Sequence, residues 1–233
     1  MAMRPLKVVF HLGSPLMVDS ERPIHLDAIV ASAVAAEAEA IGHDDAWRAA
    51  DDLSEYFEKS VHENGWVWKA SALYFEPHAR CDALFVPFNM VRRSDPDLFY
   101  DDLDRGRWSP ERKINPSTFK IDTGSGQQRG YQWVAQARLM KQATAWAIGD
   151  PGAVQSALER IDHIGKMGRN GFGRVTRVEV GAADASDVDR WMLRTLPVGM
   201  AGMAGVHYEP TMACLRAPYW RKTDRVMAID PVV

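Results

Sequence analysis

Residues 165–175 read GKMGRNGFGRV and hold four glycines within nine positions. Glycine permits positive φ and lets the backbone come close to a ligand, and free backbone N–H groups in such a loop bind phosphate oxygens. The stretch also carries arginine and lysine, and arginine stacks on exposed bases. We therefore predict a phosphate-binding and RNA-binding loop made of Lys166, Gly168, Arg169, Asn170, Gly171, Phe172, Gly173 and Arg174.

The loop does not match two common classes of phosphate-binding loop. It is not a Walker loop, because it lacks the Gly-Lys-Ser/Thr ending. It does not open a dinucleotide-binding helix either, since a helix is predicted before it and a strand after it. A tight helix-to-strand connection that only needs glycine stays open as an alternative.

The segments on either side of the loop have regular patterns. Before it, Asp150 and Pro151 are typical of a helix N-cap and first helical position. The apolar face of that helix is predicted to be Val154, Ala157, Leu158, Ile161 and Ile164. After the loop, residues 174–180 are predicted to form a strand.

The N-terminal part begins with a buried strand over residues 6–12. Apolar residues at helical spacing then predict a helix from Leu26 to about Ile41, with Asp27 favouring the helix dipole in the first turn and Gly42 ending the helix. A second helix is predicted over residues 44–59, with its buried face formed by Ala46, Ala50, Leu53 and Phe57.

Further strands are predicted over residues 66–76, 83–93 and 191–196, and residues 94–113 are expected to form a long charged loop. Residues 119–122 and 131–140 flank TGSGQQRG and predict a hairpin with a mobile tip. Arg129 lies at that tip, from which it is expected to reach RNA.

The fold class is therefore α+β. Without insertions, the order is strand, helix, strand, strand, helix, glycine-rich loop, strand. This is the βαββαβ order of ferredoxin-like, RRM-like units, which are used by RNA-recognition modules.

The net charge of −3 averages over segregated regions. Twelve acids lie between Asp19 and Glu63, whereas residues 123–149 and 164–178 contain no acid and several cations, so a local basic surface is expected despite the acidic total. Two cysteines without metal-ligand or disulfide spacing predict a reduced, cytoplasmic setting with no metal and no cofactor. No apolar run is long enough to span a membrane.

Two motifs carry a family resemblance. GKMGRNGFGRV resembles the glycine-rich loop of the RAMP superfamily of CRISPR-associated proteins, and PIHLDAIVASAV, residues 23–34, is similar to the HLDAL-like start of the first helix in these subunits. Size, a single such loop and the HLDA start resemble the Cas-five group most, and within it the Csf-three type of type IV effector complexes.

The resemblance implies a single RAMP domain over residues 1–233, with an inserted or thumb-like hairpin region at about 74–138 and a C-terminal extension at about 199–233. It implies a non-catalytic subunit that caps the 5′ handle of the guide RNA and contacts the backbone and large subunits of the complex. Contact with target DNA through the complex is left open.

Two further functions are compatible with these residues. Some RAMP relatives cut guide-RNA precursors with a histidine as general acid or base, so His11 and His25 are candidates for an endonuclease. His25, at a helix N-terminus, is also a candidate RNA-phosphate ligand. The other function is that of a small-molecule enzyme or regulator with an anion site. Base stacking is an option for Trp133, Phe172, Tyr219 and Trp220.

Overall fold

The first strand of the chain lies inside the main sheet. In the computed structural model, β1 (Arg4–Leu12) pairs antiparallel with β7 (Met140–Gly149) on one side and with β8 (Val175–Ala182) on the other. β4 (Tyr74–Pro77) adds to the far edge of β7, which gives the order β4-β7-β1-β8. Strands far apart in the sequence therefore become neighbours, and the predicted strands at 6–12 and 174–180 are confirmed.

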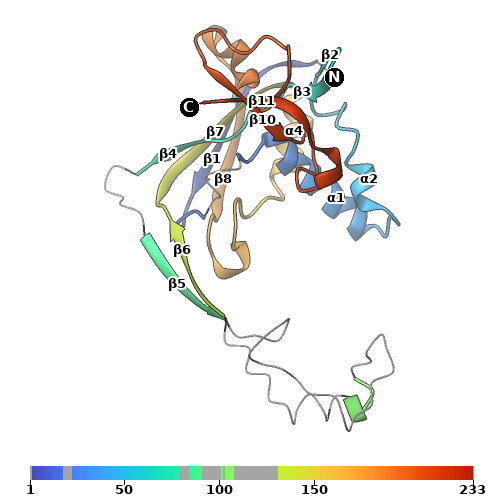
Figure 1. Cartoon of the computed structure of the whole chain (residues 1–233), viewed down its shortest axis with the longest axis vertical. Coiled ribbons are helices and arrows are strands. Elements are labelled where there is room, and N and C mark those ends of the chain that lie inside the picture. The colour runs from blue at the N-terminus through green and yellow to red at the C-terminus, as the bar shows by residue number, and fades with distance from the viewer. Residues whose placement is uncertain are drawn as a thin grey trace. The chain divides into compact units, whose positions relative to one another are not determined.

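Two helices connect strands of this sheet and pack against one of its faces (Figure 1). α1 (Leu26–Ala40) follows β1, and Gly42, at φ 78°, supplies the left-handed turn after it. α4 (Pro151–Leu158) runs between β7 and β8, and the Asp150 carboxylate accepts a hydrogen bond from the Ala153 N–H at 2.9 Å. Both predicted helix starts are confirmed, although α4 ends before Ile161.

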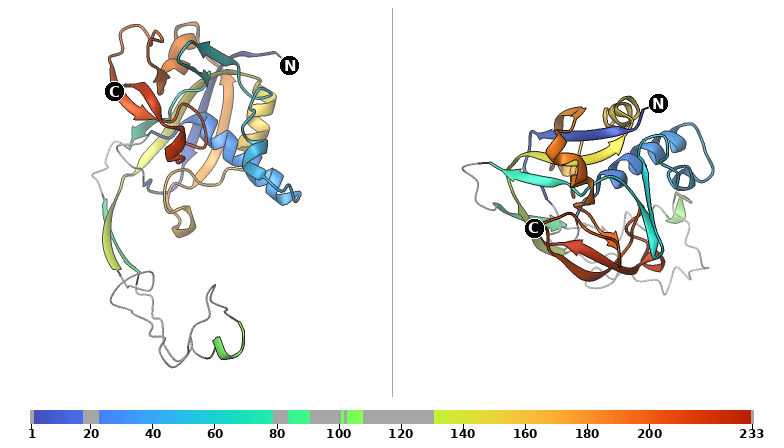
Figure 2. Two further views of the ribbon diagram at one scale, coloured as in Figure 1. Left: turned by 45° about the vertical axis from the view of Figure 1, so that its right-hand side comes forward. Right: turned by 90° about the horizontal axis from the view of Figure 1, so that it is seen from above.

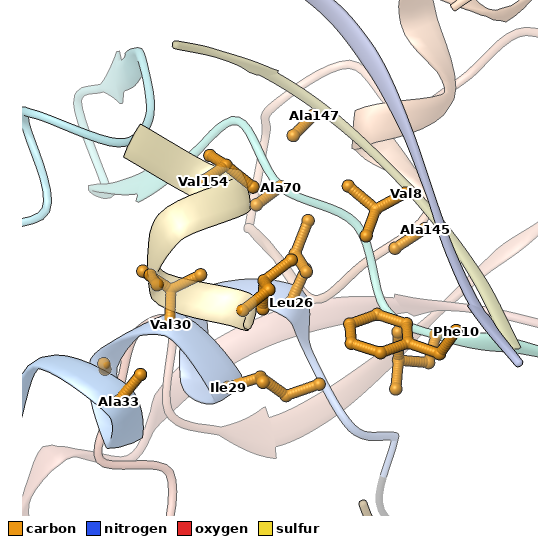
Figure 3. Packing of buried hydrophobic residues seen from close by; sticks show 14 of the residues in the cluster. Val8, Phe10, Leu26, Ile29, Val30, Ala33, Ala70, Ala145, Ala147 and Val154 are labelled. Carbon is orange, nitrogen blue, oxygen red and sulfur yellow. The ribbon is translucent and has the colours of Figure 1, made fainter. Parts of the chain in front are cut away.

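The main core lies between these helices and the sheet (Figure 3). In the register of β1 and β7, Val8 faces Ala145 and Phe10 faces Ala143. The small alanines of β7 leave room for the larger side chains of the helices. Those packed into this core include Leu26, Ile29, Val30 and Val154. Alternation along β1 thus directs every second residue into the helix-covered core.

The opposite face of the sheet is partly covered by a 3-10 helix, η3 (Ala185–Met192). The indole N–H of Trp146, on β7, donates to the Asp187 carboxylate at 3.1 Å. Arg190 lies 4.7 Å from the centre of the Trp146 ring. This contact explains why a large polar-tipped side chain alternates with the alanines of β7.

Shorter strands form separate sheets. β2 (Lys59–His62) and β3 (Gly65–Trp68) make a hairpin. β9 (Leu196–Pro197), β10 (Tyr208–Ala213) and β11 (Val226–Pro231) make a three-stranded sheet in the order β10-β11-β9. β10 and β11 are the red strands in Figures 1 and 2. The C-terminal region thus has its own sheet and its own small core of five buried residues, Val67, Trp191, Leu196, Leu215 and Ala228.

The predicted second helix over 44–59 is wrong except for one turn, α2 (Ala46–Ala49). The Asp52 carboxylate accepts the Ser54 N–H at 2.9 Å, a local bond that competes with helix formation. Phe57 instead forms an isolated β-bridge with Gly149. Ala50, Leu53 and Phe57 are nevertheless buried, as the apolar pattern indicated.

Two strand predictions need correction. The strand predicted over 66–76 is two strands, because β3 pairs with β2 whereas β4 pairs with β7. The strand predicted over 191–196 is the end of η3 followed by the two-residue β9. In both places one continuous apolar run is divided between two different structural elements. The periodicity of the sequence does not show where one element ends and the next begins.

The structure describes residues 2–17, 23–78, 84–90, 101, 103–107 and 131–232. Contacts divide the chain into two compact units, Met1–Ala83 with Ala137–Val233, and Leu84–Gln136. The second unit contains a two-stranded ribbon of β5 (Leu84–Met90) and β6 (Tyr131–Ala137). Arg129 and the predicted hairpin strand at 119–122 lie outside the described residues. Among those described, no helix is long and apolar enough to cross a membrane.

Candidate nucleic-acid interface

The glycine-rich loop is fastened to the segment that follows β1. The Lys166 N–H donates to the Met17 carbonyl at 2.7 Å, and the Gly173 N–H donates to the Pro15 carbonyl at 2.8 Å. The Arg174 N–H donates to the Ser14 hydroxyl at 2.9 Å. These bonds fix the two ends of the loop on the edge of the main sheet, next to β8.

Glycine is required at Gly173 for a steric reason. Its φ is 65°, and a Cβ atom there would lie 1.9 Å from the Ile164 carbonyl oxygen. Gly171 also has positive φ, 85°, but a Cβ atom there would meet nothing within 4 Å. Closing the loop therefore needs Gly173 for space and Gly171 only for its backbone conformation. A tight connection between helix and strand thus accounts for some of the glycines in this loop.

The middle of the loop forms an anion-binding backbone geometry. Met167 is left-handed, with φ 62° and ψ 32°, and is followed by a 3-10 turn, η2 (Gly168–Asn170). A left-handed residue followed by right-handed ones turns successive N–H groups toward one point, the arrangement known as a nest. In the described part of the chain, the N–H groups of Met167, Gly168 and Arg169 have no hydrogen-bond partner.

Only part of the loop backbone is available in this way. The N–H groups of Asn170 and Phe172 donate to the Met167 carbonyl, and that of Gly171 donates to the Gly168 carbonyl. The converging N–H donors are thus those of Met167, Gly168 and Arg169 rather than those of the whole loop.

The cations predicted for the loop are on its surface. Lys166, Arg169 and Arg174 are all exposed, as is Asn170, whereas Phe172 is half-buried. Within the described ranges, Arg169 and Arg174 make no ion pair. Arg177, on β8, differs because it pairs with Glu179, so its charge is already compensated.

The two candidate histidines lie in different environments. His11, at the end of β1, has its Nε2 3.1 Å from Glu179 Oε1 on β8 and is partly exposed. His25 is 3% exposed, with its ring stacked on Tyr219 at a centroid distance of 4.5 Å. Burial, with a contribution from Arg194, lowers the pKa of His25 well below its ordinary value. His25 is therefore neutral and removed from solvent.

His25 belongs to a buried polar network that the sequence analysis missed. Arg194 is fully buried and donates to the carbonyls of Trp68, Ala70, Thr195 and Leu215. It also contacts the Asp27 carboxylate at 3.3 Å and the Tyr219 hydroxyl at 2.6 Å. The Tyr219 hydroxyl donates to Asp27 at 2.8 Å. The HLDA sequence thus fastens the C-terminal region to the start of α1.

One signal for this network was visible in the sequence. Asp27 stands between Leu26 and Ile29 on the apolar face of a helix, and a carboxylate there needs a cationic partner. Its helix-dipole role does not explain its complete burial. The sequence does not indicate which arginine pairs with Asp27, because Arg194 is far away along the chain.

The aromatic residues considered for base stacking also differ in their exposure. Trp220 is 63% exposed and lies edge-on to Trp47, at a centroid distance of 6.3 Å. Tyr219 has one face covered by His25 and its hydroxyl bound to Asp27. Trp133 lies on β6, and its side chain is outside what the structure describes. Trp220 is thus exposed, although the Arg221 guanidinium lies 5.9 Å from the centre of its ring.

No group of three or more histidine, cysteine or acidic side chains is placed to hold a metal ion among the described residues. Comparison with curated proteins gave no match. A family model does match the chain, over residues 4–231, and its description is CRISPR type IV associated protein Csf3. Since this match covers nearly the whole sequence, the chain belongs to the Csf3 family of CRISPR type IV associated proteins.

Proposed function

We propose that this chain is a non-catalytic RNA-binding subunit of a type IV CRISPR ribonucleoprotein and that its glycine-rich loop binds backbone phosphates in the 5′ handle of the guide RNA. The observation that carries the proposal is the nest of N–H groups from Met167 to Arg169, beside the exposed side chains of Arg169 and Arg174. Phosphate prefers such a combination of converging N–H donors and guanidinium groups.

The fold supports the same proposal. A sheet of order β4-β7-β1-β8, with α1 after β1 and α4 between β7 and β8, has the strand order expected for a ferredoxin-like βαββαβ core. We propose that this core is the RAMP domain, and that the unit Leu84–Gln136 is its inserted, thumb-like part. Contacts with the backbone and large subunits are proposed on the basis of family membership.

RNA binding by this loop should depend steeply on salt. We propose that the three cations of the loop itself, Lys166, Arg169 and Arg174, neutralise phosphates; Arg177 lies outside the loop on β8 and is paired with Glu179. With a slope of about −0.7 per contact on single-stranded RNA, the total slope is about −2.1, and a fourfold rise in salt weakens binding about twentyfold. A metabolite site would respond much less steeply.

The test uses 5′-labelled RNA that carries the repeat-derived handle, with native and denaturing gels run at several salt concentrations. Replacing Lys166, Arg169 and Arg174 together with alanine should weaken binding and remove about two units of salt slope. A matched control replaces Arg4, Lys7 and Arg48, which lie on other elements. Equal affinity of the loop variant and the parent protein would contradict the proposal.

The same gels address the endonuclease alternative. Intact RNA supports a non-catalytic role. Cleavage at one position without metal would instead favour an endonuclease, and His11 would be the first residue to replace, since it is the more exposed of the two candidate histidines. His25 is not among the proposed phosphate contacts, because its ring is buried against Tyr219.

A further inference from the structure

The outer strands of the sheets differ in how well they are protected. An edge strand presents unpaired N–H and C=O groups, and natural proteins shield such strands by keeping them short or by placing proline in them. β4, at one edge of the main sheet, has four residues and ends at Pro77, and β10 contains Pro210. β8, at the other edge of the main sheet, has eight residues and no proline. Of these edges, that of β8 is the least protected.

A backbone hydrogen bond shows which groups of β8 point outward. The Ala183 N–H donates to the Pro5 carbonyl at 3.1 Å, and β8 pairs with β1 in one continuous register just before it. The direction of the hydrogen bonds alternates along an antiparallel strand, so the N–H and C=O groups of Val178, Val180 and Ala182 point away from β1. Among the described residues, these groups have no hydrogen-bond partner.

At its start, the same edge is already paired within the chain. The Val175 N–H donates to the Asp162 carbonyl at 2.7 Å, and the Ile164 N–H donates to the Gly173 carbonyl at 2.9 Å. Residues 162–164 thus lie beside the beginning of β8. A further strand can therefore pair only with the later part of β8.

The side chains of this later part favour an added strand. Val178 and Val180 are half-buried and pack against the main core, so the apolar layer reaches the edge of the sheet. On the opposite face, Glu179 contacts Arg177 and lies 3.1 Å from His11 Nε2. An added strand therefore extends the apolar layer without meeting an uncompensated charge of β8.

A second copy of β8 fits this edge in one symmetric register. Most homo-oligomers are two-fold dimers whose interface is self-complementary. Pairing centred on Glu179 would oppose two carboxylates, which is destabilising. Pairing centred on Val178 would bring the second strand against Arg174, whose outer side is already bridged by His163. Pairing centred on Val180 avoids both conflicts.

We propose that two copies of this chain associate by antiparallel pairing of their β8 strands about a two-fold axis at Val180. In this register Val180 pairs with its own counterpart, Val178 pairs with Ala182, and Glu179 faces Gly181. All three outward residues of each copy then form hydrogen bonds, and the two main sheets become continuous. The proposal does not depend on RNA binding, because these residues lie outside the glycine-rich loop.

The first test is the molar mass of the full chain, measured by sedimentation equilibrium over a range of concentrations. We expect the mass to rise with concentration towards twice the 26.1 kDa of one chain. A mass that stays at that of one chain up to submillimolar concentration would overturn the proposal.

A proline substitution tests the role of the edge backbone. Proline is tolerated where the N–H of an edge strand faces solvent. Val180→Pro removes the N–H group at the two-fold axis from both copies, so the dissociation constant of the dimer should rise at least about tenfold. The matched control is Val180→Thr, which keeps the N–H and the β-branched shape and should dimerise like the parent protein. Equal dimerisation of the two variants would show that β8 is not the interface.

Charge substitutions at Gly181 test the register without changing the backbone. A Cβ atom there meets nothing within 4 Å, so a side chain is accommodated. Both variants also carry Lys7→Gln, because Lys7 lies opposite Gly181 within the chain. Gly181→Glu faces Glu179 of the second copy and should weaken the dimer, whereas Gly181→Lys should strengthen it, each by about twofold to tenfold. Equal effects of the two charges would overturn the proposed register.

Discussion

The two motifs that carried the family resemblance play different roles in the structure. The loop at 165–175 presents exposed cations and a nest of N–H groups, those of Met167, Gly168 and Arg169, without partners in the described part of the chain. The HLDA segment is buried, and its aspartate contacts Arg194 and Tyr219. The HLDA segment thus serves folding, and we propose that the loop serves binding. Substitutions in the HLDA segment should therefore lower stability, whereas substitutions of the loop cations should lower RNA affinity with little change in stability.

The largest effect is expected in the buried network. Arg194→Met leaves Asp27 as an uncompensated buried charge and removes donors from four carbonyl groups. We expect the free energy of unfolding to fall by about 3–5 kcal/mol, measured by denaturant titration. The control is Arg160→Met, whose partner Glu37 lies 2.5 Å away on the surface. A loss as small as that of the control would show that the network does not stabilise the fold.

The next largest loss of stability is expected for substitutions of the loop glycines. These substitutions test whether the loop itself contributes to the stability of the fold. Gly173→Ala places Cβ against the Ile164 carbonyl and should cost about 2 kcal/mol or more. Gly171→Ala meets open space and should cost only about 1 kcal/mol, from its positive φ. Denaturant titration of both variants checks the order, and equal losses would contradict the role assigned to Gly173.

The pH dependence of stability sharpens the comparison further. His25 has its pKa lowered by burial, so below about pH 6.5 the unfolded chain binds a proton that the folded chain does not. Stability should therefore fall as the pH drops below that value, by about 1.4 kcal/mol per pH unit, until the folded-state pKa is reached. His25→Gln should remove this slope, whereas His207→Gln, on a largely exposed side chain, should keep it.

The smallest effect on stability is expected for the exposed cations of the loop. Arg169→Ala should change the free energy of unfolding by less than about 0.5 kcal/mol. It should nevertheless weaken RNA binding and reduce the salt slope by about 0.7. Binding that is unchanged, together with lower stability, would reverse the comparison between the two motifs.

Sequence reasoning predicted the elements that have strong local signals. β1 and α1 follow from apolar periodicity and Gly42, and the start of α4 follows from Asp150 and Pro151. It failed over residues 44–59, where a local Asp52 bond and a bridge from Phe57 prevail over helical spacing. The C-terminal strands β10 and β11 were not predicted, because they are short and pair mainly with each other.

The sequence by itself determined the α+β class, the position of the glycine-rich loop and the family. Only the tertiary structure decided which residues are available for binding. His25 is buried against Tyr219, and Asp27 is buried against Arg194. The physical reason is that local signals depend on neighbours within a few residues, whereas charge compensation and burial depend on partners more than a hundred residues away, such as Asp27 and Arg194.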